Sequence, residues 1–114
     1  MPYGARTVEE VRAYSREITR HLLDQGAKII VVACNTASAA ALNDLRETFP
    51  ETAFVGMEPA VKPAALSTRS GVVGVLATPG TFASPRYASL MKRFATDVTV
   101  LEDPCVGLVE RIEA

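Results

Sequence analysis

The sequence predicts an α/β protein built on parallel strands, and three observations support this. Short apolar runs rich in β-branched residues recur at residues 28–33, 53–57, 71–77 and 98–101. Helical patterns separate these runs, and this alternation implies parallel strands joined by right-handed crossovers. The first run, which leads into Cys34, is typical of a strand buried on both faces of its sheet.

A turn or loop at Pro2-Tyr3-Gly4 is predicted to precede the first helix. Thr7-Val8-Glu9-Glu10 is a capping box, in which Thr7 is the N-cap and Glu10 reaches back to it. Helical spacing continues to about Gln25, and Gly26 is expected to end the helix. The lone histidine, His21, is expected to have a structural role at the edge of the apolar face. That predicted face consists of Val8, Val11, Tyr14, Ile18 and Leu22.

The second helix is predicted over about residues 36–49, directly after the first strand, and Pro50 prevents it from continuing. Its alanines allow a close approach to the sheet. The residues available for packing are Ala39, Ala40, Leu42 and Leu45. The strand at 53–57 ends at Glu58-Pro59, and a helix is expected over about residues 60–67, with Pro63 in its first turn.

The second half of the chain repeats the pattern. The strand at 71–77 is followed by a predicted loop at 78–81, and Ser84-Pro85 predicts an N-cap with proline at the first helical position. The next helix presents Tyr87, Leu90, Met91 and Phe94 on one face. Asp103-Pro104 is expected to break the strand at 98–101, and a last helix is suggested by Leu108, Val109 and Ile112.

Composition excludes several classes of protein. The chain has 114 residues, is 48% hydrophobic and 22% charged, and carries a net charge of −1, so nothing favours nucleic acid or an anionic membrane surface as a partner. We expect no transmembrane helix and no signal peptide. Two cysteines are too few for a disulfide scaffold or a zinc cluster, which favours a reducing cytoplasm.

Cys34 is the main candidate for chemistry. It lies where a strand's carboxyl end is predicted to meet a helix's amino end, the place where open α/β sheets bind ligands. Helix N-termini attract anions and favour a thiolate, which suits proton transfer or nucleophilic attack. The alternative is that Cys34 is a small buried hydrophobe. Asn35 and Thr36 either bind a substrate or only cap the helix.

Other motifs give little. The strand ends at 34–36, 58–59 and 78–81 carry small polar residues that could line one cleft. No dinucleotide fingerprint, P-loop, metal cluster or Ser-His-Asp set is present in the sequence. His21 is expected at the opposite end of the sheet from Cys34, and Cys105 is expected to pack at the start of a helix.

The run Val32-Ala33-Cys34-Asn35-Thr36-Ala37-Ser38-Ala39 resembles bacterial glutamate racemases. The resemblance begins at Pro2-Tyr3-Gly4, continues through Gly74-Val75-Leu76-Ala77-Thr78-Pro79 and reaches Gly107-Leu108-Val109-Glu110, so it covers essentially the whole chain. Ala-Cys-Asn-Thr-Ala-Ser after an apolar strand is quite specific for this family. The wider aspartate/hydantoin racemase superfamily shares only the Cys-Asn-Thr pattern.

The resemblance implies a parallel-sheet α/β sandwich with two similar domains facing each other across a cleft. Residues 1–58 would be part of the first domain and residues 59–114 part of the second. It also implies interconversion of L- and D-glutamate by two cysteines, without a cofactor or metal. The product would supply D-glutamate for peptidoglycan, and thus for the cell wall and cell shape. The intact enzyme would be a cytoplasmic homodimer.

The resemblance assigns roles by position. Cys34 corresponds to the first of the two acid/base cysteines. The residues assigned to substrate binding are Tyr3, Gly4, Asn35, Thr36, Thr78, Thr81 and Glu110. Of these, the two threonines at 78 and 81 correspond to residues near the substrate carboxylate. Glu110 corresponds to a glutamate that supports the second half-site.

The sequence departs from the family at both ends. The strand ending in Asp-Ser-Gly and the Cys-Thr-His motif with the second catalytic cysteine are not found in residues 1–114, and Cys105 does not match that motif. We therefore expect an incomplete racemase that is inactive alone. Two alternatives stay open: a racemase of aspartate or a hydantoin, and a non-catalytic fragment that binds a carboxylate or a partner.

Overall fold

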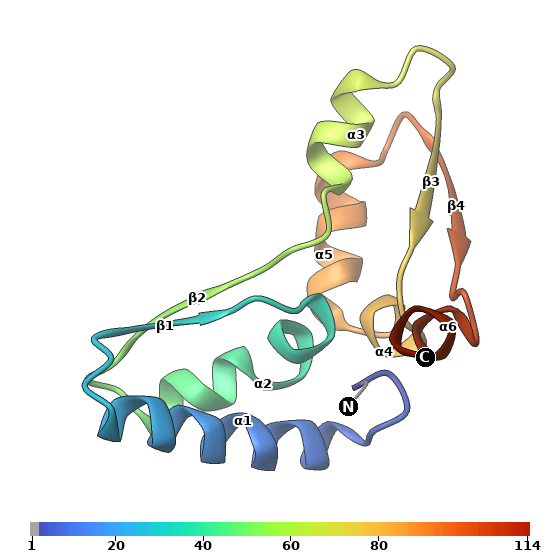
Figure 1. Cartoon of the computed structure of the whole chain (residues 1–114). Helices are drawn as coiled ribbons and strands as arrows, with labels where there is room; N and C mark the ends of the chain where they lie inside the picture. The colour runs from blue at the N-terminus through green and yellow to red at the C-terminus, as the bar shows by residue number, and fades with distance from the viewer. Residues whose placement is uncertain (1–2) are drawn as a thin grey trace. The chain divides into compact units, whose positions relative to one another are not determined.

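The computed structural model describes residues 3–114, which form two compact units, Tyr3–Met57 and Glu58–Ala114. We call these the first unit and the second unit. Each contains a two-stranded parallel sheet with helices packed against it, which confirms the α/β prediction (Figure 1). That the two units belong to two similar domains of a larger protein stays a prediction. No helix within residues 3–114 is long and apolar enough to cross a membrane.

The first unit consists of α1 (Val8–Asp24), β1 (Ile29–Val32), α2 (Asn35–Thr48) and β2 (Ala53–Gly56). The strands pair in parallel from Ile29↔Ala53 to Val32↔Gly56, and α1 lies alongside α2. The Arg12 Nε–H donates to the Ala40 carbonyl oxygen at 3.0 Å across this helix pair. The buried core of the unit consists of Val11, Ile30, Ala37, Ala41, Leu42, Leu45 and Phe54.

Helix α1 confirms the predicted caps and corrects the predicted face. Thr7 and Glu10 form the capping box, and Gly26 takes the left-handed conformation, with φ 88°, just after the helix. The residues that α1 buries are Val11, Ser15 and Thr19, whereas Val8, Ile18 and Leu22 of the predicted face are exposed. The reason is that α1 packs against α2 through its buried residues. The exposed residues of the predicted face are not covered by any described residue.

Strand β1 is half-buried, which corrects the prediction that both of its faces are buried. Ile30 is 5% exposed, but Ile29 and Val31 are 60% and 61% exposed, and Val55 of β2 is exposed on the same face. Alternate side chains of a strand point to opposite faces of a sheet. Within residues 3–57, helices cover only the face that carries Ile30 and Phe54.

The second unit consists of α3 (Val61–Ser67), β3 (Val72–Leu76), α4 (Pro79–Phe82), α5 (Pro85–Phe94), β4 (Thr99–Asp103) and α6 (Leu108–Glu113). Strands β3 and β4 pair in parallel from Val72↔Thr99 to Leu76↔Asp103. A small core of Val61, Tyr87 and Leu90 lies where α3 and α5 pack together. Ser84 caps α5 as predicted, accepting a hydrogen bond from the Tyr87 N–H at 3.1 Å.

Two boundaries in the second unit differ from the prediction. The expected loop at 78–81 contains α4, because Pro79 at the first helical position has a backbone angle already suited to a helix. Strand β4 runs to Asp103, not 101, because its ladder continues to the pair with Leu76 and the Asp103 carbonyl accepts from the Ala77 N–H at 3.3 Å. The remaining elements lie within one or two residues of their predicted bounds.

Candidate active site

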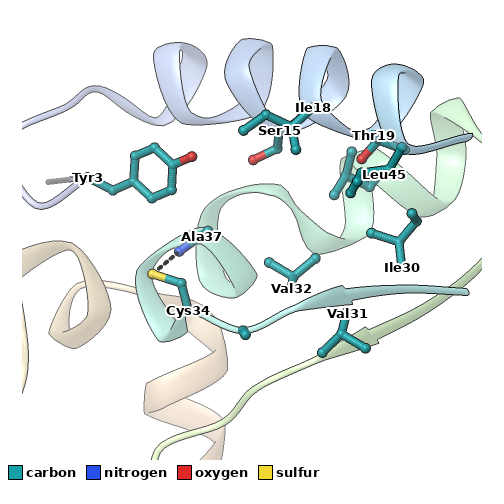
Figure 2. A pocket seen from close by; sticks show the side chains of 12 residues that line it. Tyr3, Ser15, Ile18, Thr19, Ile30, Val31, Val32, Cys34, Ala37 and Leu45 are labelled. Carbon is teal, nitrogen blue, oxygen red and sulfur yellow. Dashed lines mark hydrogen bonds between the residues drawn. The ribbon is translucent and has the colours of Figure 1, made fainter. Parts of the chain in front are cut away.

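Cys34 lies between β1 and α2 and is itself the N-cap of the helix. Its backbone is extended, with φ −142°, and its Sγ accepts a hydrogen bond from the Ala37 N–H at 3.5 Å (Figure 2). The first N–H groups of any helix lack partners inside the helix, and an N-cap side chain supplies one. Asn35 or Thr36 was expected to cap this helix, but α2 begins at Asn35, so the preceding residue takes that role.

The cap geometry gives the sulfur a specific electrostatic environment. The Ala37 N–H points at it, and the N-terminal end of the 14-residue helix α2 adds a partial positive charge. Both interactions place positive partial charge next to the sulfur atom. Cys34 is partly buried and packs against the core of the first unit, so its position is restricted.

Asn35 and Thr36 form the first turn of α2, next to the thiol. The Asn35 Oδ1 atom is buried and has no hydrogen-bond partner among the described residues. A buried acceptor without a protein partner is rare in native proteins, and such an atom is often one that bonds water, an ion or a ligand. Thr36 is partly buried. The sequence-predicted pair therefore lies beside Cys34, although a role in binding stays a prediction.

A pocket of about 170 Å³ opens between α1 and β1, and both Tyr3 and Cys34 line it (Figure 2). Its lining is mainly apolar, with Ile18 and Leu22 from α1 and Ile30 and Val32 from β1. Asn35, Thr36 and Gly4 do not line it; Gly4 is exposed in the turn that follows Tyr3. An apolar groove is better suited to packing than to binding a charged ligand.

The other predicted site residues belong to the second unit. Thr78 is the N-cap residue of α4, and its hydroxyl lies 3.3 Å from that of Thr81, which is buried. Glu110 is exposed on α6. Because Cys34 and these residues lie in different units, the prediction that three strand ends line one cleft stays a prediction.

Cys105 and His21 offer little for catalysis. Cys105 has a left-handed backbone, with φ 48°, and its N–H donates to Asp103 Oδ1 at 2.8 Å. Burial, together with the Asp103 carboxylate, raises the pKa of the Cys105 thiol, which disfavours the thiolate at neutral pH. Cys105 is partly buried and precedes α6, whereas His21 is exposed in the last turn of α1. Within residues 3–114, no group of three His, Cys, Asp or Glu side chains could hold a metal ion.

Sequence reasoning missed Ser38, although this serine lies within the Cys-Asn-Thr-Ala-Ser motif. The Ser38 hydroxyl donates to the Val32 carbonyl at 3.0 Å and accepts from the Met57 N–H at 2.9 Å. A signal was present in the sequence, because a serine four residues after Cys34, among alanines, lies on the same helix face as the cysteine.

The comparisons with known proteins agree on one family. The family described as Asp/Glu/Hydantoin racemase matches residues 1–114. A curated glutamate racemase of Ectopseudomonas mendocina is 60% identical over 114 residues, which is 100% of this chain and 43% of that protein. A glutamate racemase of Pseudomonas aeruginosa is 58% identical over the same 100% of this chain and 43% of its own length.

Solved structures give the same result. The crystal structure of Escherichia coli glutamate racemase in complex with L-glutamate and the activator UDP-MurNAc-ala superimposes with a TM-score of 0.89, at 36% identity over 100% of this chain and 43% of that one. Glutamate racemase from Aquifex pyrophilus gives a TM-score of 0.74, at 38% identity over 94% of this chain and 42% of that one. The chain therefore spans less than half the length of the relatives it matches.

Proposed function

Because the chain belongs to the Asp/Glu/hydantoin racemase family, we propose that it is part of a glutamate racemase, an isomerase that interconverts L- and D-glutamate. The observation that carries the proposal is the Cys34 sulfur at the start of α2, held by the Ala37 N–H beside the unpartnered Asn35 Oδ1 atom. Identity of 60% across the whole chain supports this substrate over aspartate or a hydantoin. The activity is proposed for a longer protein that contains these residues.

In this proposal Cys34 exchanges the α-proton of glutamate. That proton is only weakly acidic, so the base must be held close to it in a preorganised site. The N–H groups at the start of α2 are suited to the substrate carboxylate, whose charge grows as the proton leaves. The Asn35 Oδ1 atom is suited to accept a hydrogen bond from the substrate ammonium group. Tyr3, Gly4 and Thr36 complete the first half-site. Thr78 and Thr81 are proposed to lie near the substrate carboxylate, and Glu110 to support the second half-site.

Inversion at a carbon atom requires a second acid/base group on the opposite face of the substrate. One thiol cannot reach both faces, and the raised pKa of Cys105 leaves little of its thiolate form at neutral pH. We therefore propose that the second group comes from outside residues 1–114. It follows that the 114-residue chain alone does not racemise glutamate.

The wider biological role follows from the same family membership. We propose a cofactor-independent reaction in the cytoplasm that supplies D-glutamate for peptidoglycan synthesis. A homodimer is proposed for the intact enzyme, with no nucleic acid as a partner. The net charge of −1 supports the last point, because nucleic-acid-binding surfaces are usually basic.

The test follows the α-proton of L-glutamate in D₂O by proton NMR, with chiral chromatography of the product. We expect exchange and D-glutamate from the longer protein, and neither from the chain alone. Cys34→Ser should lower the rate at least about 100-fold, in line with loss of a general acid/base. Cys105→Ser is the matched control and should stay within about twofold, because its thiol has no assigned step.

Three outcomes would contradict the proposal. Full exchange activity in Cys34→Ser would remove the proposed catalytic thiol. Turnover of aspartate or a hydantoin in place of glutamate would favour the other branch of the family. Turnover by the 114-residue chain alone would show that a second base lies within it.

A further inference from the structure

Ser38 occupies an unusual position for a serine inside a helix. It is 1% exposed, and its hydroxyl bonds two groups outside its own helix, the Val32 carbonyl at the end of β1 and the Met57 N–H just after β2. Serines in helices more commonly bond the carbonyl one turn back or face solvent. The Ser38 backbone N–H makes the ordinary helical bond to the Cys34 carbonyl oxygen at 2.8 Å, which does not depend on the hydroxyl. The hydroxyl thus holds two backbone groups that lie outside α2.

The two hydroxyl bonds of Ser38 lie where the hydrogen-bonded ladder between the strands ends. The ladder between β1 and β2 ends at the pair Val32↔Gly56, so the Met57 N–H lies just beyond the last strand pair. The Ser38 hydroxyl supplies the partner that the sheet does not. At the end of β1, the Ser38 hydroxyl bonds the Val32 carbonyl and the Ser38 N–H bonds the Cys34 carbonyl. Only Ala33 lies between these two bonded carbonyl groups.

We propose that Ser38 is a positioning residue for Cys34, which sets where the thiol lies relative to the first N–H groups of α2. Its burial prevents it from touching a substrate, so it acts only through the backbone. Loss of the hydroxyl would leave the Val32 carbonyl and the Met57 N–H without this partner in a largely apolar environment. The turn would then relax, and the Ala37 N–H would no longer be aimed at the Cys34 sulfur.

The test measures the rate at which iodoacetamide alkylates Cys34 between pH 6 and 10, with the modified peptide identified by mass spectrometry. Ser38→Ala should slow alkylation at neutral pH by about threefold to tenfold, as expected for loss of a hydrogen-bonded support. Ser38→Thr keeps the hydroxyl and should stay within about twofold of the original rate. Cys105 serves as an internal reference whose rate should not change.

A matched control separates positioning from general loss of stability. Ser84 is also buried, and its hydroxyl also bonds one carbonyl, that of Thr81 at 2.7 Å, and one N–H, that of Tyr87, but it lies in the second unit. Ser84→Ala should leave the Cys34 profile unchanged. A Cys34 profile that is identical in the original chain and in folded Ser38→Ala would overturn the proposal, whatever the change in stability.

A second measurement needs no variant and therefore covers the case in which Ser38→Ala does not fold. The Met57 amide should exchange its hydrogen slowly in D₂O, at least about 100-fold slower than an open amide, although it lies outside the sheet ladder. Rapid exchange at Met57 would show that the Ser38 bond is not maintained and would overturn the proposal.

The inference rests on the proposed role of Cys34, and the two can fail separately. In the longer protein, Ser38→Ala should lower kcat for glutamate more than it changes KM, since the residue acts on the reacting thiol and not on the ligand. Slower alkylation of Cys34 in Ser38→Ala, in a protein that does not turn over glutamate, would refute the proposed function and leave the positioning role intact.

Discussion

A methyl group on Gly56 would overlap the Cδ2 atom of Leu42, whose side chain is almost fully buried in the first unit. The Leu42 side chain therefore occupies the space that a Cβ atom at position 56 would need. We expect Gly56→Ala to lower the free energy of unfolding of the first unit by about 1–3 kcal/mol, because Leu42 must shift in a packed core. Urea unfolding followed by circular dichroism measures this.

The second unit supplies the control for this substitution. Gly74 is also a strand glycine, in β3, and a methyl group there would meet nothing within 4 Å. Gly74→Ala should leave the stability unchanged or raise it by up to about 1 kcal/mol, because alanine restricts the unfolded chain more than glycine does. Equal losses at both positions would show that close packing is not the reason for glycine at 56.

The sequence predicted the elements well and their packing less well. Local signals decide where helices begin and end, so the caps at Thr7, Gly26, Ser84 and Pro85 could be located without the structure. The buried face of α1 could not be predicted in this way. An amphipathic pattern shows which residues can be covered, but it does not show which neighbouring element covers them. The contact between Gly56 and Leu42 depends on the distance between a strand and a helix, which the sequence does not contain.

Tyr87 should make the second unit sensitive to alkali. Its hydroxyl is buried and has no hydrogen-bond partner among the described residues. Burial, with a smaller contribution from the nearby Glu102 carboxylate, raises the pKa of Tyr87 from 10.0 to about 12. The unfolded chain loses this proton first, so stability is complete below pH 10 and falls as pH rises from 10 to 12, by at most about 2–3 kcal/mol.

Tyr87→Phe tests this directly. The variant keeps the ring and its contact with Phe82, so its stability near pH 8 should be equal or slightly higher. Between pH 10 and 12 it should lose less stability than the original chain. An ultraviolet titration that shows all tyrosines ionising near pH 10 would contradict the prediction.

The contact between α1 and α2 should weaken in acid. Arg16 and Asp44 form a paired hydrogen bond in which the Arg16 Nε–H lies 2.8 Å from Asp44 Oδ2, and this bond holds the pKa of Asp44 below its usual value of 3.8. The stabilisation is therefore complete above about pH 4 and lost as pH falls below it. Asp44→Asn should lower the urea midpoint at pH 7 and should remove this part of the acid dependence. An unchanged midpoint at pH 7 would show that the pair contributes nothing.

The two helix caps should differ in their importance. Thr7 is exposed, and its hydroxyl accepts from the Glu10 N–H at 3.2 Å, so Thr7→Ala should cost about 1 kcal/mol. Ser84 is buried and bonds two backbone groups, so Ser84→Ala should cost more, about 2 kcal/mol. The free energy of unfolding of each variant measures the difference, and the reverse order would show that burial of the cap is not decisive.

As with the fold, some residues of the candidate site could be predicted from the sequence and others could not. Cys34, Asn35 and Thr36 could be chosen from sequence because small polar residues interrupt an apolar strand just where a helix starts. The sequence did not indicate that the Cys34 sulfur itself caps α2, because cysteine is a weak acceptor and an unusual cap. The role of Ser38 depends on bonds to residues 6 and 19 positions away, which only the folded chain brings together.

Because one face of the sheet in the first unit is exposed, the stability of the isolated chain should depend on its own concentration. Ile29, Val31 and Val55 present apolar side chains that no described residue covers, and β1 has no paired neighbour on its outer edge within residues 3–57. In concentrated solution we expect copies of the chain to associate through this exposed apolar face and through the unpaired edge of β1. The isolated chain should then unfold at a temperature that rises with its own concentration, a dependence that vanishes once another polypeptide covers the face.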